Sequence, residues 1–381
     1  MSSPPPATLP NAAADVSHPA PDDAPGEATV LAVPLIPRVS AADGELPEGA
    51  DLSVALAAPP RVAILTVSPQ VFPEPATPRF FPFVLAADPS GLLLVQANLG
   101  FPLSREVVDH PRHQSLQWRD TASRYFVLNA ITASAFRLPD PEELILHQAL
   151  LGLIASPRGG GHYMVAELQP IIGSDEATLL CFSSEVGEWV EKSIHYPLPP
   201  RPLAPICVIS HHGRLWWVDL TWGVITSDPF ADEPVLGFVP FPKGKVLQCR
   251  EAWGETDQYR YVGVSDGKLR FVDMYVSAHP DSTEWTLEHE ARFADIWADK
   301  SYKATGLSKK IPVLALIHPE NPNVVYFFLE GHLFGVDVRA RKVVECKAYE
   351  LFAPPSYYVA NRFTHAWELP RALSSVVPLV H

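Results

Sequence analysis

Three aspartates recur at the same place in a repeated sequence pattern, and they are the first candidates for chemistry in this chain. Asp219, Asp273 and Asp337 each end the pattern G-[RKH]-L-x-x-V-D. Carboxylates in such a set can hold a metal ion or move a proton. Each one, however, ends a strand-like stretch, where an aspartate often accepts N–H groups of the following turn. Three equivalent positions also lie far apart unless they converge on a central channel, so we predict structural capping rather than a metal or acid–base site.

Two adjacent histidines, His211 and His212, form the second candidate. Neighbouring residues of a strand point to opposite faces, and no third ligand follows at H-x-x-x-H spacing, so we predict no metal site. The glycine-rich stretch RGGGH at 158–162 lacks the Lys-Ser/Thr of a phosphate-binding loop and indicates a hairpin tip. The sequence contains neither G-x-S-x-G nor H-E-x-x-H. It therefore predicts no catalytic, metal-binding or cofactor-binding residue; a catalytic site assembled from distant loops stays open as the alternative.

The cysteines do not have the spacing of a metal site. They are Cys181, Cys207, Cys249 and Cys346. None forms a C-x-x-C pair, and each lies in or beside an apolar stretch. This pattern favours buried free thiols over a zinc cluster.

The charge of the chain limits its partners. It has 29 basic and 43 acidic residues, a formal net charge of −14, and no basic run longer than Lys309–Lys310. Phosphate backbones and anionic membranes are repelled by such a field, so we expect protein partners and neither nucleic acid nor membrane. The sequence has no signal-peptide pattern and no N-x-[ST] site, and no apolar run approaches the roughly 18 residues of a membrane span. These features indicate an intracellular protein, cytoplasmic or nuclear.

A repeated unit holds the aspartates and histidines and indicates which elements position them. Around three glycines the chain reads ICVISHHGRLWWVDL, YRYVGVSDGKLRFVDM and NVVYFFLEGHLFGVDV, and two looser copies lie upstream. The glycines of the five copies are Gly91, Gly161, Gly213, Gly267 and Gly331. A strand, a glycine turn and a second strand predict a β-hairpin. A tryptophan segment after two of the hairpins, around Trp189 and Trp285, predicts a further strand.

Hairpins that return at intervals of about 40–50 residues or a little more are typical of propeller blades. The 41 prolines among 381 residues also favour many short elements over long helices. We therefore predict an all-β protein, a β-propeller or propeller-like fold of about six blades. Such a fold commonly closes by joining strands from both termini, so we expect a strand at 29–37 or 60–67 to pair near 324–329 and 333–338.

The tryptophans of the central repeat fit the same fold. In a strand with one solvent-exposed face, apolar residues occupy only every second position. Leu215 and Val218 are three positions apart, so they point to opposite faces of the strand. Both faces of the strand are therefore apolar, as in a blade between two neighbours. We predict that Trp216 and Trp217 fill the two inter-blade spaces, with indole N–H groups directed at carbonyls, rather than forming a ligand platform.

The remaining segments set the domain limits. Residues 1–27 are rich in Pro, Ala and Asp and predict a disordered tail. Residues 28–372 predict a single propeller-like domain, and 373–381 a C-terminal tail. Short helices are expected at 140–150, where a strand is the alternative, and within 292–306.

The stretch GRLWWVDLTWGVITSDPF, the following VPFP and the later GKLRFVDM resemble the grass-expanded plant family called domain of unknown function 1618. The resemblance is best over 213–345, and it implies no established chemistry. Residues 125–141 and EVGEWVE more loosely resemble the propeller-like domains associated with plant F-box proteins. An F-box itself would be an apolar helical segment of some forty residues, which the Pro-rich N-terminus does not offer.

Two functions follow as hypotheses. The first is a non-enzymatic protein-interaction or recognition module that binds through loops on one face. The second is a glycan-directed or other hydrolase with a site in the channel, which propellers also host. The absence of a catalytic motif favours the first.

Overall fold

The fold was analysed in a computed structural model, which describes part of the chain. The described residues are 32–39, 46–57, 63–72, 82–98, 105–110, 113–120, 123–143, 145–146, 150–171, 173–199, 201, 203, 205–247, 256–274, 285–348, 365–369 and 371–374. The predicted tail at 1–27 and Cys249 lie outside them, as does most of the predicted C-terminal tail.

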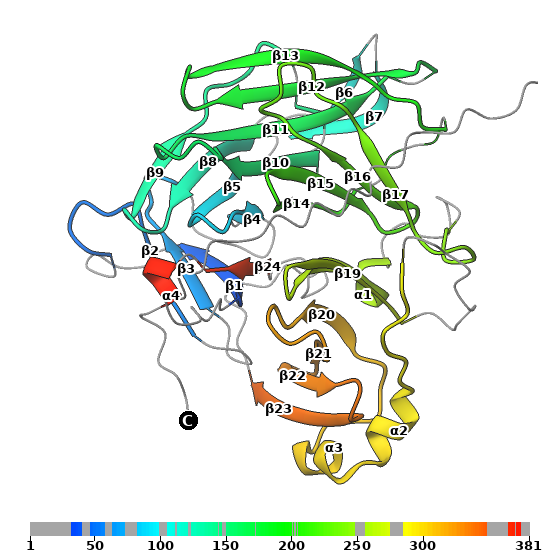
Figure 1. The fold of residues 1–381 in the computed structure, drawn as a ribbon. Coiled ribbons are helices and arrows are strands. Elements are labelled where there is room, and N and C mark those ends of the chain that lie inside the picture. The colour runs from blue at the N-terminus through cyan, green and yellow to red at the C-terminus, as the bar shows by residue number, and fades with distance from the viewer. Residues whose placement is uncertain are drawn as a thin grey trace, which may run out of the picture.

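The described residues form seven sheets, and the six that lie around a common centre are named blades here (Figure 1). The first three are β2 (Leu52–Ala55), β3 (Ala63–Val67), β1 (Ala32–Val39) and β24 (His365–Glu368); β4 (Phe83–Ala87), β5 (Leu92–Asn98), β8 (Ser123–Asn129) and β9 (Ser134–Arg137); and β10 (Leu151–Ala155), β11 (Tyr163–Pro170), β12 (Glu176–Ser183) and β13 (Glu188–His195). The others are β14 (Cys207–His211), β15 (Arg214–Asp219), β16 (Gly223–Ser227) and β17 (Gly237–Pro240); β18 (Arg260–Ser265) and β19 (Lys268–Asp273); and β20 (Val313–Ile317), β21 (Val324–Leu329), β22 (His332–Asp337) and β23 (Lys342–Ala348). A separate hairpin, β6 (Arg105–His110) and β7 (His113–Asp120), is inserted in the second blade.

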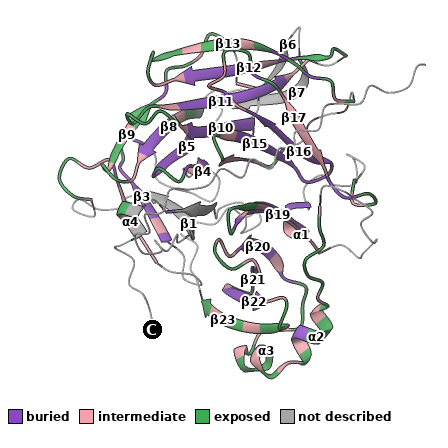
Figure 2. Cartoon of the chain, in the orientation of Figure 1, coloured by how far each residue is buried: buried purple, intermediate pink, exposed green. Residues whose placement is uncertain are grey.

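The core lies between the blades. One apolar cluster joins the first and second blades, and others join the second to the third, the third to the fourth, the fourth to the fifth and the fifth to the sixth. Figure 2 shows the same distribution, with buried residues along the inner strands and exposed residues at the outer strands β9 and β13. A sheet that buries both faces needs apolar residues at odd and at even positions of its strands, which explains the pattern in the central repeat. The fold is all-β and propeller-like, as predicted.

The repeated glycines lie in tight hairpin turns. His212 and Gly213 have φ values of 48° and 70°, and Asp266 and Gly267 have 51° and 65°. Positive φ at both central residues is the requirement of a type I′ turn, whose twist matches that of the flanking strands. The glycine of the motif is therefore a backbone requirement.

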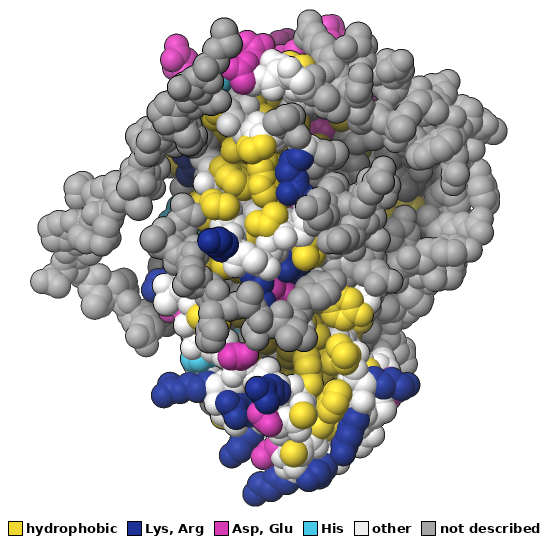
Figure 3. Space-filling model, turned by 90° about the vertical axis from the view of Figure 1, so that its right-hand side faces the viewer, with side chains coloured by type: hydrophobic (Ala, Val, Ile, Leu, Met, Phe, Trp, Pro, Cys, Tyr) yellow, Lys and Arg dark blue, Asp and Glu magenta, His cyan; other side chains and the backbone are white. Residues whose placement is uncertain are grey.

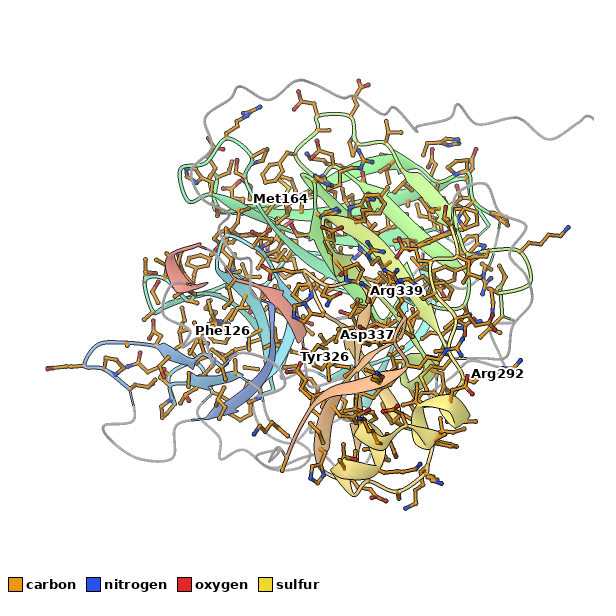
Figure 4. The ribbon with its side chains drawn as sticks, turned by 60° about the horizontal axis from the view of Figure 1, so that its bottom comes forward. Phe126, Met164, Arg292, Tyr326, Asp337 and Arg339 are labelled. Atoms are coloured by element: carbon orange, nitrogen blue, oxygen red, sulfur yellow. The ribbon has the colours of Figure 1, made fainter. Side chains whose placement is uncertain are left out.

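The last copy of the motif is displaced within its blade. Gly91, Gly161, Gly213 and Gly267 join the first and second strands of their blades, whereas Gly331 joins the second and third, β21 and β22. Gly335 is therefore not the equivalent of Trp217, although both stand four residues after the motif glycine. It leaves room for the ring of Tyr326 on β21, which a Cβ at Gly335 would approach to 3.0 Å; Figure 4 labels Tyr326 in this blade.

Both termini contribute to one blade, but not through the partners that the sequence suggested. β1 pairs antiparallel with β24 and parallel with β3 in the first blade. The predicted pairing with 324–329 and 333–338 is wrong, because those strands, β21 and β22, complete the sixth blade with β20 and β23. The free edge of β1 is instead covered by residues 365–368.

Helices are short and few in the described part of the chain. α2 (Phe293–Ala298) and α3 (Lys300–Thr305) confirm the helical prediction for 292–306, and α1 (Thr256–Tyr259) and α4 (Arg371–Ser374) are single turns. In the predicted range 140–150, the described residues 140–143 and 145–146 form no helix, and Leu150 is in a 3₁₀ turn, so the prediction is confirmed at Leu150 alone. No helix in the described ranges has the length and apolarity needed to cross a membrane.

The two tryptophan segments have different structures. Trp189 lies on β13, as predicted. Residues 285–290 form no strand, so the prediction for Trp285 is wrong over the residues that are described. Its indole packs on Phe241 and Phe271, and Nε1 donates to the Pro240 carbonyl at 2.7 Å. The segment is held by this side-chain contact rather than by a strand ladder.

Candidate functional site

The paired tryptophans belong to the architecture. Trp217 on β15 is fully buried in the cluster between the third and fourth blades, and its Nε1 donates to the Leu150 carbonyl at 2.7 Å. Trp216 faces the cluster shared with the fifth blade, and its Nε1 donates to the His211 carbonyl at 3.1 Å. Both indoles thus fill inter-blade spaces and bond to carbonyls, as predicted.

Two of the three repeated aspartates cap turns. Asp219 Oδ1 accepts the N–H of Thr221 at 2.9 Å and its hydroxyl at 2.6 Å. Asp337 Oδ1 accepts the N–H of Ala340 at 2.7 Å. These contacts confirm the structural interpretation for Asp219 and Asp337.

The third aspartate has a different role from the one predicted. Asp273 Oδ2 forms ion pairs with Arg260 Nη2 at 3.2 Å and with Lys245 Nζ at 3.1 Å, and the aspartate side chain is almost fully buried. Arg260, itself 1% exposed, also donates to the carbonyls of Leu220 and Lys245. Asp273 is thus half of a buried ion pair that ties the fifth blade to the segments after β15 and β17. The ion pair was not predicted, and it forms because the carboxylate meets a guanidinium on the paired strand β18; the turn that Asp273 was predicted to cap begins outside the described residues.

The centre of the molecule holds a carboxylate that the sequence did not single out. The innermost strands β4, β10 and β14 lie against one another, and Asp88 follows β4 (Figure 1). Its Oδ2 accepts the Ser210 hydroxyl at 2.6 Å and the Ala155 N–H at 3.1 Å, and Oδ1 accepts the Ser90 N–H at 2.9 Å. Asp88 therefore joins the ends of three inner strands. Its only sequence signal is the turn-forming stretch ADPSG.

Replacing Asp88 with asparagine should lower the free energy of unfolding by about 2–3 kcal/mol, because the amide presents an N–H₂ group to donors and loses charge-assisted bonds. The measurement is a denaturant midpoint. Asp228→Asn is the matched control, since Asp228 Oδ1 accepts only a local turn N–H, that of Phe230, among the bonds described. A loss at Asp88 no larger than the loss at Asp228 would contradict the inter-blade role.

The histidines come together in a way that the sequence did not predict. The rings of His211 and His212 lie 3.9 Å apart rather than on opposite faces, because the positive φ of His212 turns it back over the strand end. Burial, followed by His212, lowers the pKa of His211 to about 4. Burial also lowers the pKa of His318 on the sixth blade, whose Nδ1 accepts the N–H groups of Glu320 and Asn321. Both imidazoles are neutral near pH 7.

The neutral histidines predict a loss of stability in acid. The folded-state pKa of His211 lies below that of the unfolded chain, about 6.5, so between pH 6.5 and 4 the unfolded state binds more protons. Stability from this group is complete above pH 6.5 and is lost as the pH falls toward 4. Because the ring is only partly buried and is screened by water, we expect a loss of about 1 kcal/mol at pH 5. The measurement is the free energy of unfolding of the wild type and of His211→Gln at pH 5 and above pH 6.5. An equal pH dependence in the two proteins would exclude His211 as the source of the loss.

The remaining sequence candidates do not assemble a reactive site. The 158–162 stretch is the exposed tip between β10 and β11, with φ near 75° at Gly159, Gly160 and Gly161. Cys181 and Cys207 are free, and burial raises the pKa of each thiol to about 12; Cys346 is also free. Within the described residues, no three His, Cys, Asp or Glu side chains are placed to hold a metal ion.

A comparison with protein families matches the central repeat. The model of a protein family described as protein of unknown function, DUF1618, matches residues 217–326, which confirms the resemblance over that range. No curated protein matches the chain.

The solved structures that align with this chain have low sequence identity and low TM-scores. A structure titled mitotic checkpoint complex is 12% identical with a TM-score of 0.30, and 70% of this chain aligns with 63% of that one. AztD from Citrobacter koseri is 12% identical with a TM-score of 0.32, over 71% of this chain and 74% of that one. The β-propeller domain of Cps50 (Swd1) from Myceliophteria thermophila is 9% identical with a TM-score of 0.29, over 70% and 87%. The chain thus spans less than two thirds of the length of the matched chain in the mitotic checkpoint complex.

Proposed function

We propose that this propeller-like chain, with its central match to a family of unknown function, is a non-enzymatic recognition module that binds a protein partner. The proposal is carried by the hydrogen bonds that engage the Asp88 carboxylate. Asp88 is the carboxylate at the meeting point of the inner strands, where a channel enzyme would need a free acid or base. Both of its oxygens accept hydrogen bonds: Oδ2 accepts from Ala155 and Ser210 of the next two blades, and Oδ1 accepts from Ser90 in its own turn. Asp219, Asp273 and Asp337 are likewise engaged in caps and an ion pair.

A hydrolase is the second candidate, and one observation favours it. Ser210, His211 and Asp88 bring a hydroxyl, a neutral imidazole and a carboxylate to the same end of the inner strands. The geometry does not fit a nucleophile, however. The Ser210 hydroxyl donates a hydrogen bond to the Asp88 carboxylate. Adjacent residues of β14 point to opposite faces, so His211 is not the base for Ser210.

Affinity capture from an extract of the source cells, followed by mass spectrometry, tests the recognition proposal. We expect a partner that binds the wild type saturably in purified form and binds Ser210→Ala equally well. The hydrolase candidate predicts instead that the purified chain cleaves ester or glycoside substrates and that Ser210→Ala abolishes the cleavage. That result, without a saturable partner, would overturn the proposal.

A further inference from the structure

The outer edge of the sixth blade carries a charge opposite to that of the whole chain. Lys300 and Lys303 come from α3, Arg339 and Arg341 from the turn between β22 and β23, and Lys342 from the start of β23. All five are exposed. These residues are named the basic edge here. Figure 3 shows Lys and Arg side chains gathered at the lower end of the molecule, where Figure 1 places α2, α3 and β23.

Packing of the helices on the blade brings these residues together. α3 lies along β23, and Ser301 Oγ accepts the Val343 N–H at 2.9 Å. Ser301, Lys342 and Lys300 all lower the pKa of the Asp299 carboxyl, with the Ser301 hydrogen bonds contributing most. The helix and the strand therefore present one continuous basic surface.

The carboxylates within this surface are already engaged. Asp295 pairs with Arg341 at 3.2 Å, and Asp299 caps α3 by accepting the Ser301 N–H at 2.8 Å. Among the described residues, no ion pair involves Lys300, Arg339 or Lys342. Three cations are thus available to an anionic partner.

An apolar side chain lies on the same surface. Val344 is 52% exposed and stands two residues after Lys342 on β23, at the point where the register with β22 shifts. A partner that matches this surface carries carboxylates and an apolar residue. We propose that the basic edge binds an acidic peptide segment with an apolar side chain, presented by a partner protein. This inference rests on the proposed recognition function.

The charge of the whole chain favours a peptide over a polyphosphate. Nucleic acid affinity comes from many phosphates, which would extend beyond the edge into the field of a molecule with net charge −14. A short acidic segment meets only the local surface, because salt screens charges farther than about 8–10 Å away.

Fluorescence anisotropy with a labelled peptide of Asp and Glu residues around a central Leu tests the proposal. We expect saturable binding that weakens with salt and falls about tenfold or more in Lys300→Glu/Lys342→Glu. Lys243→Glu/Lys268→Glu, a matched reversal of two exposed lysines elsewhere, should bind as the wild type does. Val344→Ser should weaken this peptide but not one in which the Leu is replaced by Ser. Thermal midpoints confirm folding, and Lys300→Gln/Lys342→Gln repeats the test without charge reversal.

Several results would overturn this inference. One is the absence of saturable binding of the labelled peptide. Another is an equal loss of peptide affinity in Lys243→Glu/Lys268→Glu. A third is binding of oligothymidylate or phosphatidylserine vesicles through the same lysines that is tighter than binding of the peptide. A cellular partner that binds the wild type and Lys300→Glu/Lys342→Glu equally would remove the basic edge as the binding surface and leave the recognition function standing. Failure of the recognition function itself would appear as no saturable partner for the wild type.

Discussion

Replacing Trp217 with alanine will lower the free energy of unfolding by about 3–5 kcal/mol, the cost of a large-to-small change in a core. The side chain is fully buried between the third and fourth blades and contributes a hydrogen bond to Leu150. Its removal leaves a cavity at the junction of two sheets, which rigid strands fill poorly, and an unpaired carbonyl. The denaturant midpoint measures the loss.

Two further variants separate packing from other roles. Trp217→Phe keeps most of the volume but not the N–H donor, so it should cost clearly less than alanine. Trp216→Ala removes a half-buried indole and should also cost less. If Trp217→Ala keeps the wild-type midpoint and loses the captured partner, Trp217 is a binding residue and the structural interpretation is wrong.

Replacing Arg260 with methionine will destabilise the protein by about 3–5 kcal/mol, the range for breaking a buried ion pair by removing one partner. The change leaves Asp273 buried with reduced compensation and leaves two carbonyls, those of Leu220 and Lys245, without the guanidinium. Packing is largely kept, because methionine preserves much of the length of the side chain. Chemical denaturation again measures the effect.

A double-mutant cycle attributes that loss to the pair. Arg260→Met/Asp273→Asn should be more stable than the sum of the two single losses predicts, since the loss of the Arg260–Asp273 contact is counted in both single variants; Lys245 loses its partner in both variants that lack the carboxylate. Arg137→Met is the surface control: its pair with Asp140 at 3.4 Å is exposed on both sides, and such pairs contribute about 0–1 kcal/mol. Strict additivity at Arg260 and Asp273 would show that the pair does not act as a unit.

The fold class could be predicted from the sequence because its signals are local. Gly213 and Gly267 mark turns that need positive φ, and each turn lies between two strand-like runs. The opposite parity of Leu215 and Val218 indicated a strand buried on both faces, and the structure places Trp216 and Trp217 in the two spaces that this implies. The same motif misled at Gly331, since a β-turn is identical in sequence whether it joins the first two strands of a blade or the next two.

The sequence by itself determined which segments become hairpins and which faces are apolar, since turn chemistry and side-chain alternation act over a few residues. Only the tertiary structure decided which polar groups meet. Asp88 and Ser210 are 122 residues apart and touch because β4 and β14 reach the same centre. Asp273 follows the same motif as Asp219, yet it binds Arg260 because the arginine is its direct partner on the paired strand. β24 covers β1 rather than the sixth blade, since the sixth blade already has four strands. The energy of a buried carboxylate depends on the donors that long-range packing brings within hydrogen-bond distance, and no local pattern encodes them.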